Sequence, residues 1–170
     1  MIALQIKETK NFMNALLIAE QFDMFQVEET TITTFNTFEI DGHVIKDFYT
    51  SEEIEELESK SGQFPDFSFW KDIRPICFQL IKGKKTPVSF RVILHANPDM
   101  IKEIANAPDC EIAENLIRSL VLNIRYDNGH VTCVTGTSFH TFVMDKTADT
   151  LWDKYIRQFF TSLKLDYEEM

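Results

Sequence analysis

Two short turn signals, Asp41-Gly42 and Asn128-Gly129, constrain the fold of this 170-residue chain more than any other feature. Each lies between segments rich in β-branched and aromatic residues, which are typical of strands. Both residues of such a pair can adopt the positive φ angles of a type I′ turn, so each pair is predicted to close a β-hairpin. In the first hairpin the return strand is expected over residues 43–49, and this register sets Asn36 opposite Asp47.

The same order of elements is predicted on both sides of a helical segment. Residues 1–49 and residues 88–144 each follow the order strand, helix, strand, strand, strand. Residues 50–83 join these two units and contain two predicted helices. No linker rich in proline, glycine or serine interrupts the chain. We therefore expect an α+β fold in a single domain over residues 1–170, with the two units related by a pseudo-twofold axis.

A long amphipathic helix is predicted near the end of the chain, over residues 148–165. Its apolar face carries large side chains at helical spacing: Leu151, Trp152, Tyr155, Ile156, Phe159, Phe160 and Leu163. Asp149, Asp153 and Arg157 lie on the opposite, polar face. Because the apolar face is too wide for a free surface helix, we expect it to pack against a sheet or against the central helix.

The composition indicates a folded, acidic protein. Hydrophobic residues make up 44% of the chain and include 15 phenylalanines, which is enough apolar material for a packed core. The chain has 27 acidic and 17 basic residues, and the formal charge of −10 repels nucleic-acid backbones at long range. Three cysteines without a CxxC pair favour a reduced, cytoplasmic setting over a disulfide framework or a thiolate zinc site. No apolar run is long enough to predict a membrane span.

One concentration of basic residues stands out in this acidic chain. It comprises Arg74, Lys82, Lys84, Lys85 and Arg91. These side chains are candidates for binding an anion around the end of the helix that is predicted to finish near Gly83. The alternative is that the lysines stay in solvent and complement the negative end of that helix dipole, which itself repels anions.

Four other side chains are candidates for a polar site: Asn36, Asp47, His95 and His140. His95 is predicted on the polar face of its strand, whereas His140 shares a strand face with Phe142 and Met144 and is expected to be buried. Asp47 is the first carboxylate to consider for acid–base chemistry, with a cross-strand hydrogen bond to Asn36 as the alternative. The four histidines lack the spacing of a metal site, so no metal or other cofactor is predicted.

The element order resembles that of the processivity clamps, the replication factors that encircle DNA. A clamp domain consists of two strand–helix–three-strand units, so the resemblance implies a clamp-like arrangement. In a clamp the helices of these units face DNA and need basic residues. The corresponding segments, residues 8–22 and 97–107, are slightly acidic instead. We therefore expect the fold without the DNA-encircling function.

Three segments carry a second resemblance: residues 35–42, 74–87 and 122–126, which read FNTFEIDG, RPICFQLIKGKKTP and LNIRY. They are similar to a family of small proteins from anaerobic Gram-positive bacteria, and the similarity extends over nearly the whole chain. That family has no assigned activity. The resemblance therefore implies a bacterial cytoplasmic origin and supplies no catalytic residues.

The familiar catalytic motifs are absent from the sequence. It contains no GxSxG, GxxxxGK[ST] or GxGxxG pattern, and Cys77 and Cys133 fall on predicted apolar faces. These observations favour a non-catalytic cytoplasmic binding or assembly module whose partner is a protein, either a second copy or another chain. The alternative is a small-molecule enzyme with a dispersed acid–base site. A deep polar pocket with convergent His, Asp or Arg side chains favours the enzyme, and a flat apolar patch favours the module.

Overall fold

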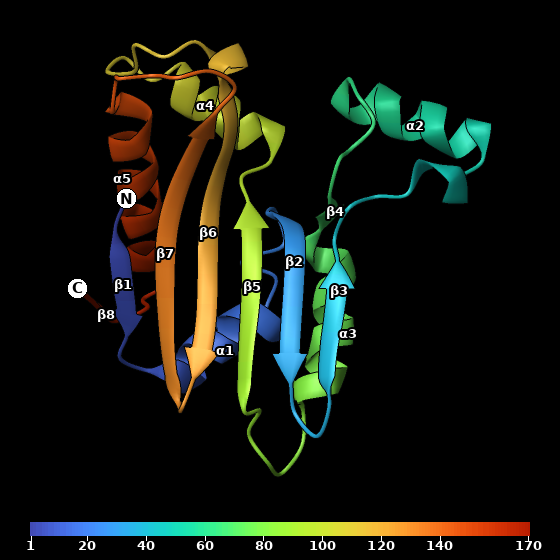
Figure 1. Ribbon diagram of the computed structural model, residues 1–170, viewed down its shortest axis with the longest axis vertical. Coiled ribbons are helices and arrows are strands. Elements are labelled where there is room, and N and C mark those ends of the chain that lie inside the picture. Colours follow the sequence, from blue (N-terminus) through green and yellow to red (C-terminus); the bar gives the residue numbers. More distant parts are fainter.

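The computed structural model describes all residues from Met1 to Met170. Eight strands form one antiparallel sheet in the order β3-β2-β5-β6-β7-β1-β8, with β4 paired to the start of β2 (Figure 1). The strands are β1 (Ala3–Ile6), β2 (Gln26–Thr33), β3 (Thr37–Asp41), β4 (Ser68–Phe69), β5 (Ser89–His95), β6 (Ile117–Asp127), β7 (His130–Phe139) and β8 (Tyr167–Glu169). The helices are α1 (Thr9–Leu17), α2 (Ser51–Ser61), α3 (Trp70–Ile81), α4 (Pro98–Ala105) and α5 (Thr147–Ser162), and short 3-10 turns cover Lys46–Phe48 and Glu114–Leu116.

Helices α1, α3 and α5 lie against one face of the sheet (Figure 1). Side chains alternate along the central strands, so Val92 and Leu94 of β5 and Leu122 of β6 are buried between the sheet and the helices. Arg91 and Asn123 lie on the opposite face, which is toward the viewer in Figure 1. None of the helices is both long and apolar enough to span a membrane.

The predicted C-terminal helix is present as α5, and its apolar face enters the core. Trp152, Ile156 and Phe160 are fully buried, whereas Phe159, which belongs to the same predicted face, is only half-buried. The Phe160 ring meets the Phe12 ring of α1 edge to face, with 6.0 Å between centroids. This contact joins α5 to α1 on the covered face of the sheet.

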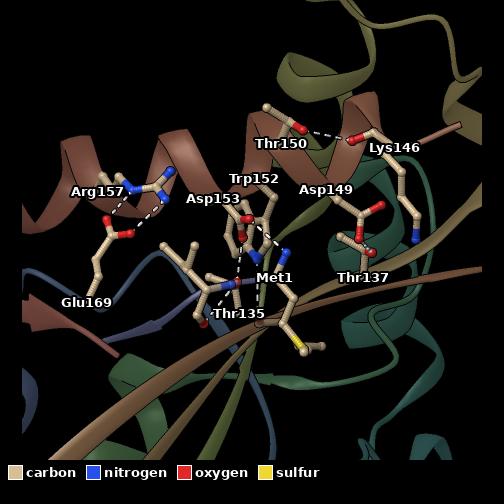
Figure 2. Close-up of polar contacts among 12 residues, drawn as sticks. Met1, Thr135, Thr137, Lys146, Asp149, Thr150, Trp152, Asp153, Arg157 and Glu169 are labelled. Atoms are coloured by element: carbon tan, nitrogen blue, oxygen red, sulfur yellow. Dashed lines mark hydrogen bonds and ion pairs between the residues drawn. The ribbon is translucent and has the colours of Figure 1, made fainter. Parts of the chain in front are cut away.

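The polar side of α5 differs from the prediction, because it faces β7 and not solvent alone (Figure 2). Asp153 is buried; its carboxylate accepts a hydrogen bond from Thr135 Oγ1 (2.5 Å) and pairs with the amino group of Met1 (2.8 Å). Asp149 accepts a hydrogen bond from Thr137 Oγ1 (2.5 Å). Helical periodicity locates these carboxylates on one side of α5, but it cannot indicate that two threonines of β7 lie opposite them.

The second predicted hairpin is confirmed, and the first is wrong. Asn128 (φ 49°) and Gly129 (φ 84°) connect β6 to β7 as expected. The turn between β2 and β3 lies instead at residues 34–36, with Thr33 opposite Thr37, and Asp41 is the last residue of β3. Gly42 is required there for a close approach and not for a turn, because a Cβ atom at this position would lie 1.8 Å from the Val27 carbonyl oxygen.

The α+β class and the two connecting helices, α2 and α3, are confirmed, but neither unit has its third strand. Residues 43–49 contain a bridge residue and a 3-10 turn, and residues 140–144 have no regular structure. The two units also occupy different places in the sheet: β5 pairs with β6, whereas β1 pairs with β7 and β8 and not with β2. The pairing does not confirm the pseudo-twofold relation or the clamp-like topology. The single domain over residues 1–170 stays a prediction.

Candidate functional site

An arm of the chain, residues 43–67, projects from the end of β3 and returns at β4 (Figure 1). It contains a 3-10 turn and α2, and α2 buries none of its residues. The arm is fastened at its base through Gly42. The Gly42 N–H donates to the Glu28 carbonyl (2.8 Å), and the Gly42 carbonyl accepts from the Ser68 N–H (2.8 Å). The arm is therefore tied to the sheet where its two ends meet.

Between the arm and the rest of the protein lies a groove of about 1580 Å³, here called the arm groove. Its walls come from the arm, from the ends of β5 and β7, from the start of β6 and from the first turn of α4. Three of the four histidines line it: His43, His95 and His140. The fourth, His130, follows the β6–β7 turn at the other end of the sheet. The fold thus gathers polar side chains that are far apart in the sequence.

Two histidine–carboxylate contacts are stacked beside each other at the base of the arm. His95, only 8% exposed, bonds the Glu28 carboxylate through Nε2. The His95 ring packs on Phe67 with 4.7 Å between centroids, and Phe67 packs in turn on His43, also at 4.7 Å. His43 Nδ1 lies 2.6 Å from Asp41 Oδ1, and hydrogen bonds from the backbone and side chain of His43 lower the pKa of the Asp41 carboxyl. One aromatic ring of the arm therefore lies between two imidazoles, each held by its own carboxylate.

Two β-bulges direct charged side chains into the groove. Glu28 has no partner in the register between β2 and β5, and Arg118 has none in the register between β6 and β7. A bulge changes the direction of a side chain at the point where the ladder is interrupted. Both residues line the arm groove, on strands that flank β5 from opposite sides. The groove therefore receives one carboxylate and one guanidinium from positions where the sheet is irregular.

The wall formed by β6 and β7 is polar. Ser119 and Ser138 are register partners, and their Oγ atoms lie 2.7 Å apart. His140 lines the same wall and is exposed, so its predicted burial is wrong. The reason is that β7 ends at Phe139, and the following residues leave the sheet without forming a strand face that could be covered.

The groove is close to neutral, although the whole chain has a formal charge of −10. Its lining includes four basic side chains and five carboxylates: Lys46, Lys60, Lys71, Arg118, Glu28, Asp66, Asp72, Asp99 and Glu114. Lys46 and Lys60 form ion pairs with glutamates of α2, at 3.2 Å and 2.6 Å. Lys71 lies over the Phe69 ring, 5.5 Å from its centroid. Arg118 has neither a carboxylate nor an aromatic partner in the structure.

The predicted anion-binding residues are not brought together. Arg74 is held by Asp23 through two hydrogen bonds of 2.8 and 2.9 Å, which raise the pKa of the guanidinium. Arg91 pairs with Glu29 (2.7 Å) on the uncovered face of the sheet. Lys82, Lys84 and Lys85 are spread along the loop between α3 and β5, at the end of the molecule away from the arm groove (Figure 1).

Of the four predicted polar-site residues, only His95 and His140 share the groove. Asn36 lies in the β2–β3 turn and Asp47 in the 3-10 turn of the arm, so they do not face each other. The sequence reasoning missed Glu28 and Arg118, because a bulge has no recognisable residue pattern. It also missed the role of Phe67; the aromatic run of residues 64–70 was a visible signal, but it does not reveal which ring lies between two histidines.

The structure contains no group of three or more His, Cys, Asp or Glu side chains that could hold a metal ion. A model of the family of unknown function DUF5721 matches residues 15–168. The chain belongs to this family. The DUF5721 match begins within α1 and ends within β8, so it includes the arm and both bulges. No curated protein and no solved structure matches the chain. The prediction of a family without an assigned activity is therefore confirmed, and the family supplies no site residues.

Proposed function

We propose that this protein is a non-catalytic binding module and that the arm groove holds its ligand, a small polar molecule. The observation that carries the proposal is the position of His95. A largely buried imidazole needs hydrogen-bond partners, and His95 has one at Nε2, in the Glu28 carboxylate. No protein group bonds Nδ1. Because His95 lines the groove, we infer that a ligand there can bond this nitrogen.

The construction of the arm supports the same proposal. Phe67 packs against both His43 and His95, so a ligand that contacts either imidazole also contacts the base of the arm. Because the arm is fastened mainly at its base, ligand binding there would stabilise an otherwise lightly held segment. The groove thus combines polar groups that can recognise a ligand with a segment, the arm, whose stability increases when a ligand binds.

A protein partner, either a second copy or another chain, is a further part of the proposal. Large apolar side chains are exposed on the arm (Ile45 and Phe48) and on the segment after β7 (Phe142 and Met144). Exposed apolar groups of this size are typical of interaction surfaces. A reduced, cytoplasmic setting is proposed because all three cysteines are free, and a bacterial origin is proposed from the resemblance carried by residues 35–42, 74–87 and 122–126.

Histidine resonances provide the test. We would label the histidines with ¹³C and titrate the protein with a panel of fragments that carry amide, hydroxyl, carboxylate or phosphate groups. We expect at least one fragment to shift the signals of His43 and His95 along one saturable curve. His130, at the opposite end of β7, is the internal control and should not move. A panel in which no fragment moves these two signals, or in which His130 moves equally, would refute the proposal.

The Glu28–His95 contact, and the polar groove on which three histidines converge, also favour a second candidate, a small-molecule enzyme. A carboxylate at Nε2 keeps the proton on that nitrogen and leaves Nδ1 able to accept one, which is the arrangement of a general base. The two functions differ in outcome. A binding module returns a bound fragment unchanged, whereas an enzyme converts it, and His95→Gln would abolish the conversion while a His130→Gln control would not.

A further inference from the structure

We propose that the β6–β7 wall of the arm groove is a phosphate subsite formed by Arg118, Ser119, Ser138 and His140. This inference rests on the proposed binding function, because it assigns ligand chemistry to one part of the same groove. It identifies the ligand as a small molecule with a phosphate group.

The sheet register places these four side chains together. Ser119 and Ser138 lie directly opposite each other on β6 and β7. His140 follows two residues after Ser138, directly beyond the end of β7 at Phe139. The His140 N–H bonds the Leu116 carbonyl (3.0 Å), which keeps His140 beside the start of β6 although β7 has ended. Arg118 precedes Ser119 at the bulge, and all four line the groove.

Each of these groups has hydrogen-bonding capacity left for a ligand. Arg118 is exposed, and neither its guanidinium nor the His140 ring bonds any protein group. The two serine hydroxyls bond each other, but a pair of hydroxyls uses only one of its two O–H groups in this contact. One O–H therefore remains free. Guanidinium, hydroxyl and imidazole are donor types that together suit the several oxygens of a phosphate.

The surrounding charge limits what the phosphate can be attached to. The chain has a formal charge of −10, and Glu114 and Asp99 also line the groove. A polyanion such as a nucleic acid would place many phosphates in this repulsive field. A molecule with a single phosphate group places only that group beside Arg118. The expected ligand is therefore a small phosphorylated compound.

The experiment uses inorganic phosphate as the probe, at constant pH and constant ionic strength. The full chain is titrated, and the signals of the His140 ring and the Arg118 Nε–H are followed by NMR. We expect both to shift with one dissociation constant. Arg118→Gln should weaken phosphate binding about tenfold or more, the effect of losing a charge-assisted hydrogen bond. Arg125→Gln is the matched control: it removes an arginine of the same strand that pairs with Asp127 (3.2 Å), and it should change binding less than about twofold.

The possible results separate this inference from the proposed function. If phosphate leaves His140 unmoved while uncharged fragments shift His43 and His95, the phosphate subsite is wrong and the binding function stands. If acetate binds as tightly as phosphate, the assignment of phosphate is overturned. Equal shifts at His140 and His130 would show a general ionic effect and would also overturn it. Backbone spectra of both arginine variants confirm that each remains folded, so a lost response reports on the side chain.

Discussion

Gly42 is the position at which a single methyl group should detach the arm from the sheet. In Gly42→Ala, the new Cβ atom would lie 1.8 Å from the Val27 carbonyl oxygen and 2.7 Å from its carbon. Both are backbone atoms, so no side-chain rotation relieves the overlap. Since an ordinary contact of this kind is 3.4–4 Å, the two segments would have to separate by about 1.6 Å. The hydrogen bonds that fasten the arm cannot survive such a separation.

The size of the effect follows from those bonds. Gly42 takes part in two of them, to Glu28 and to Ser68, each 2.8 Å long. Each contributes about 0.5–1.5 kcal/mol, so their loss should cost about 1–3 kcal/mol. A local opening free energy reduced by this amount corresponds to amide exchange about 5 to 150 times faster. The increase should be confined to the arm and its base, because no residue of the segment 43–69 belongs to the core cluster.

Hydrogen exchange measured by mass spectrometry would test this expectation. Peptides covering residues 43–69 should exchange faster in Gly42→Ala, while peptides of β6, β7 and α5 should keep their wild-type rates. Gly129→Ala is the matched control. Gly129 has a φ of +84° and open space around it, so alanine there costs about 1–2 kcal/mol of backbone strain without a clash. Its effect should appear only in the β6–β7 turn. Unchanged exchange in the arm of Gly42→Ala would refute the reasoning.

Three further expectations concern the core, the thiols and nucleic acid. Phe160→Ala should cost about 3–5 kcal/mol in urea unfolding, and half-buried Phe159→Ala clearly less; the reverse order would show that the packing of α5 is misjudged. Burial raises the pKa of Cys77 to about 12 and also raises that of Cys133, so a thiol reagent at pH 8 should modify only half-buried Cys110 in the native protein; rapid reaction of all three would contradict this. Duplex DNA should not bind near physiological salt because of the charge of −10, and an anisotropy titration with tight, steeply salt-dependent binding would disprove it.

Elements whose signal is local could be predicted from the sequence. The period of the C-terminal helix and the Asn128-Gly129 turn depend only on neighbouring residues, and both are present. Asp41-Gly42 has the same residue pattern as a turn, but a glycine is needed at this position for a different physical reason. Gly42 is small because the chain passes close to Val27 at a bulge, and this requirement arises from a strand that lies earlier in the sequence. The residue pattern alone cannot distinguish a glycine that a turn requires from a glycine that a close backbone approach requires.

The candidate site was less accessible to prediction, because its parts come from separate strands. His95 and His140 were recognised as polar candidates, but their partners depend on sheet order. Glu28 reaches His95 only because β2 lies beside β5 with a bulge between them, and no residue pattern encodes that bulge. The sequence does not indicate Arg118, for the same reason. Lys82, Lys84 and Lys85 form a recognisable basic cluster only because they are neighbours in the sequence.

The pairing of β1 also sets the order in which the protein can assemble during synthesis. Leu4 lies opposite Cys133 on one side and Glu169 on the other, so β1 is synthesised long before either of its two partner strands. Contacts between such distant segments carry a large loop-closure entropy and slow folding. Leu4 and Ile6 are buried in the finished protein but have no strand to pair with until β7 has been synthesised. The β7-β1-β8 side of the sheet is therefore completed last, and the unfinished chain exposes apolar side chains there that favour aggregation.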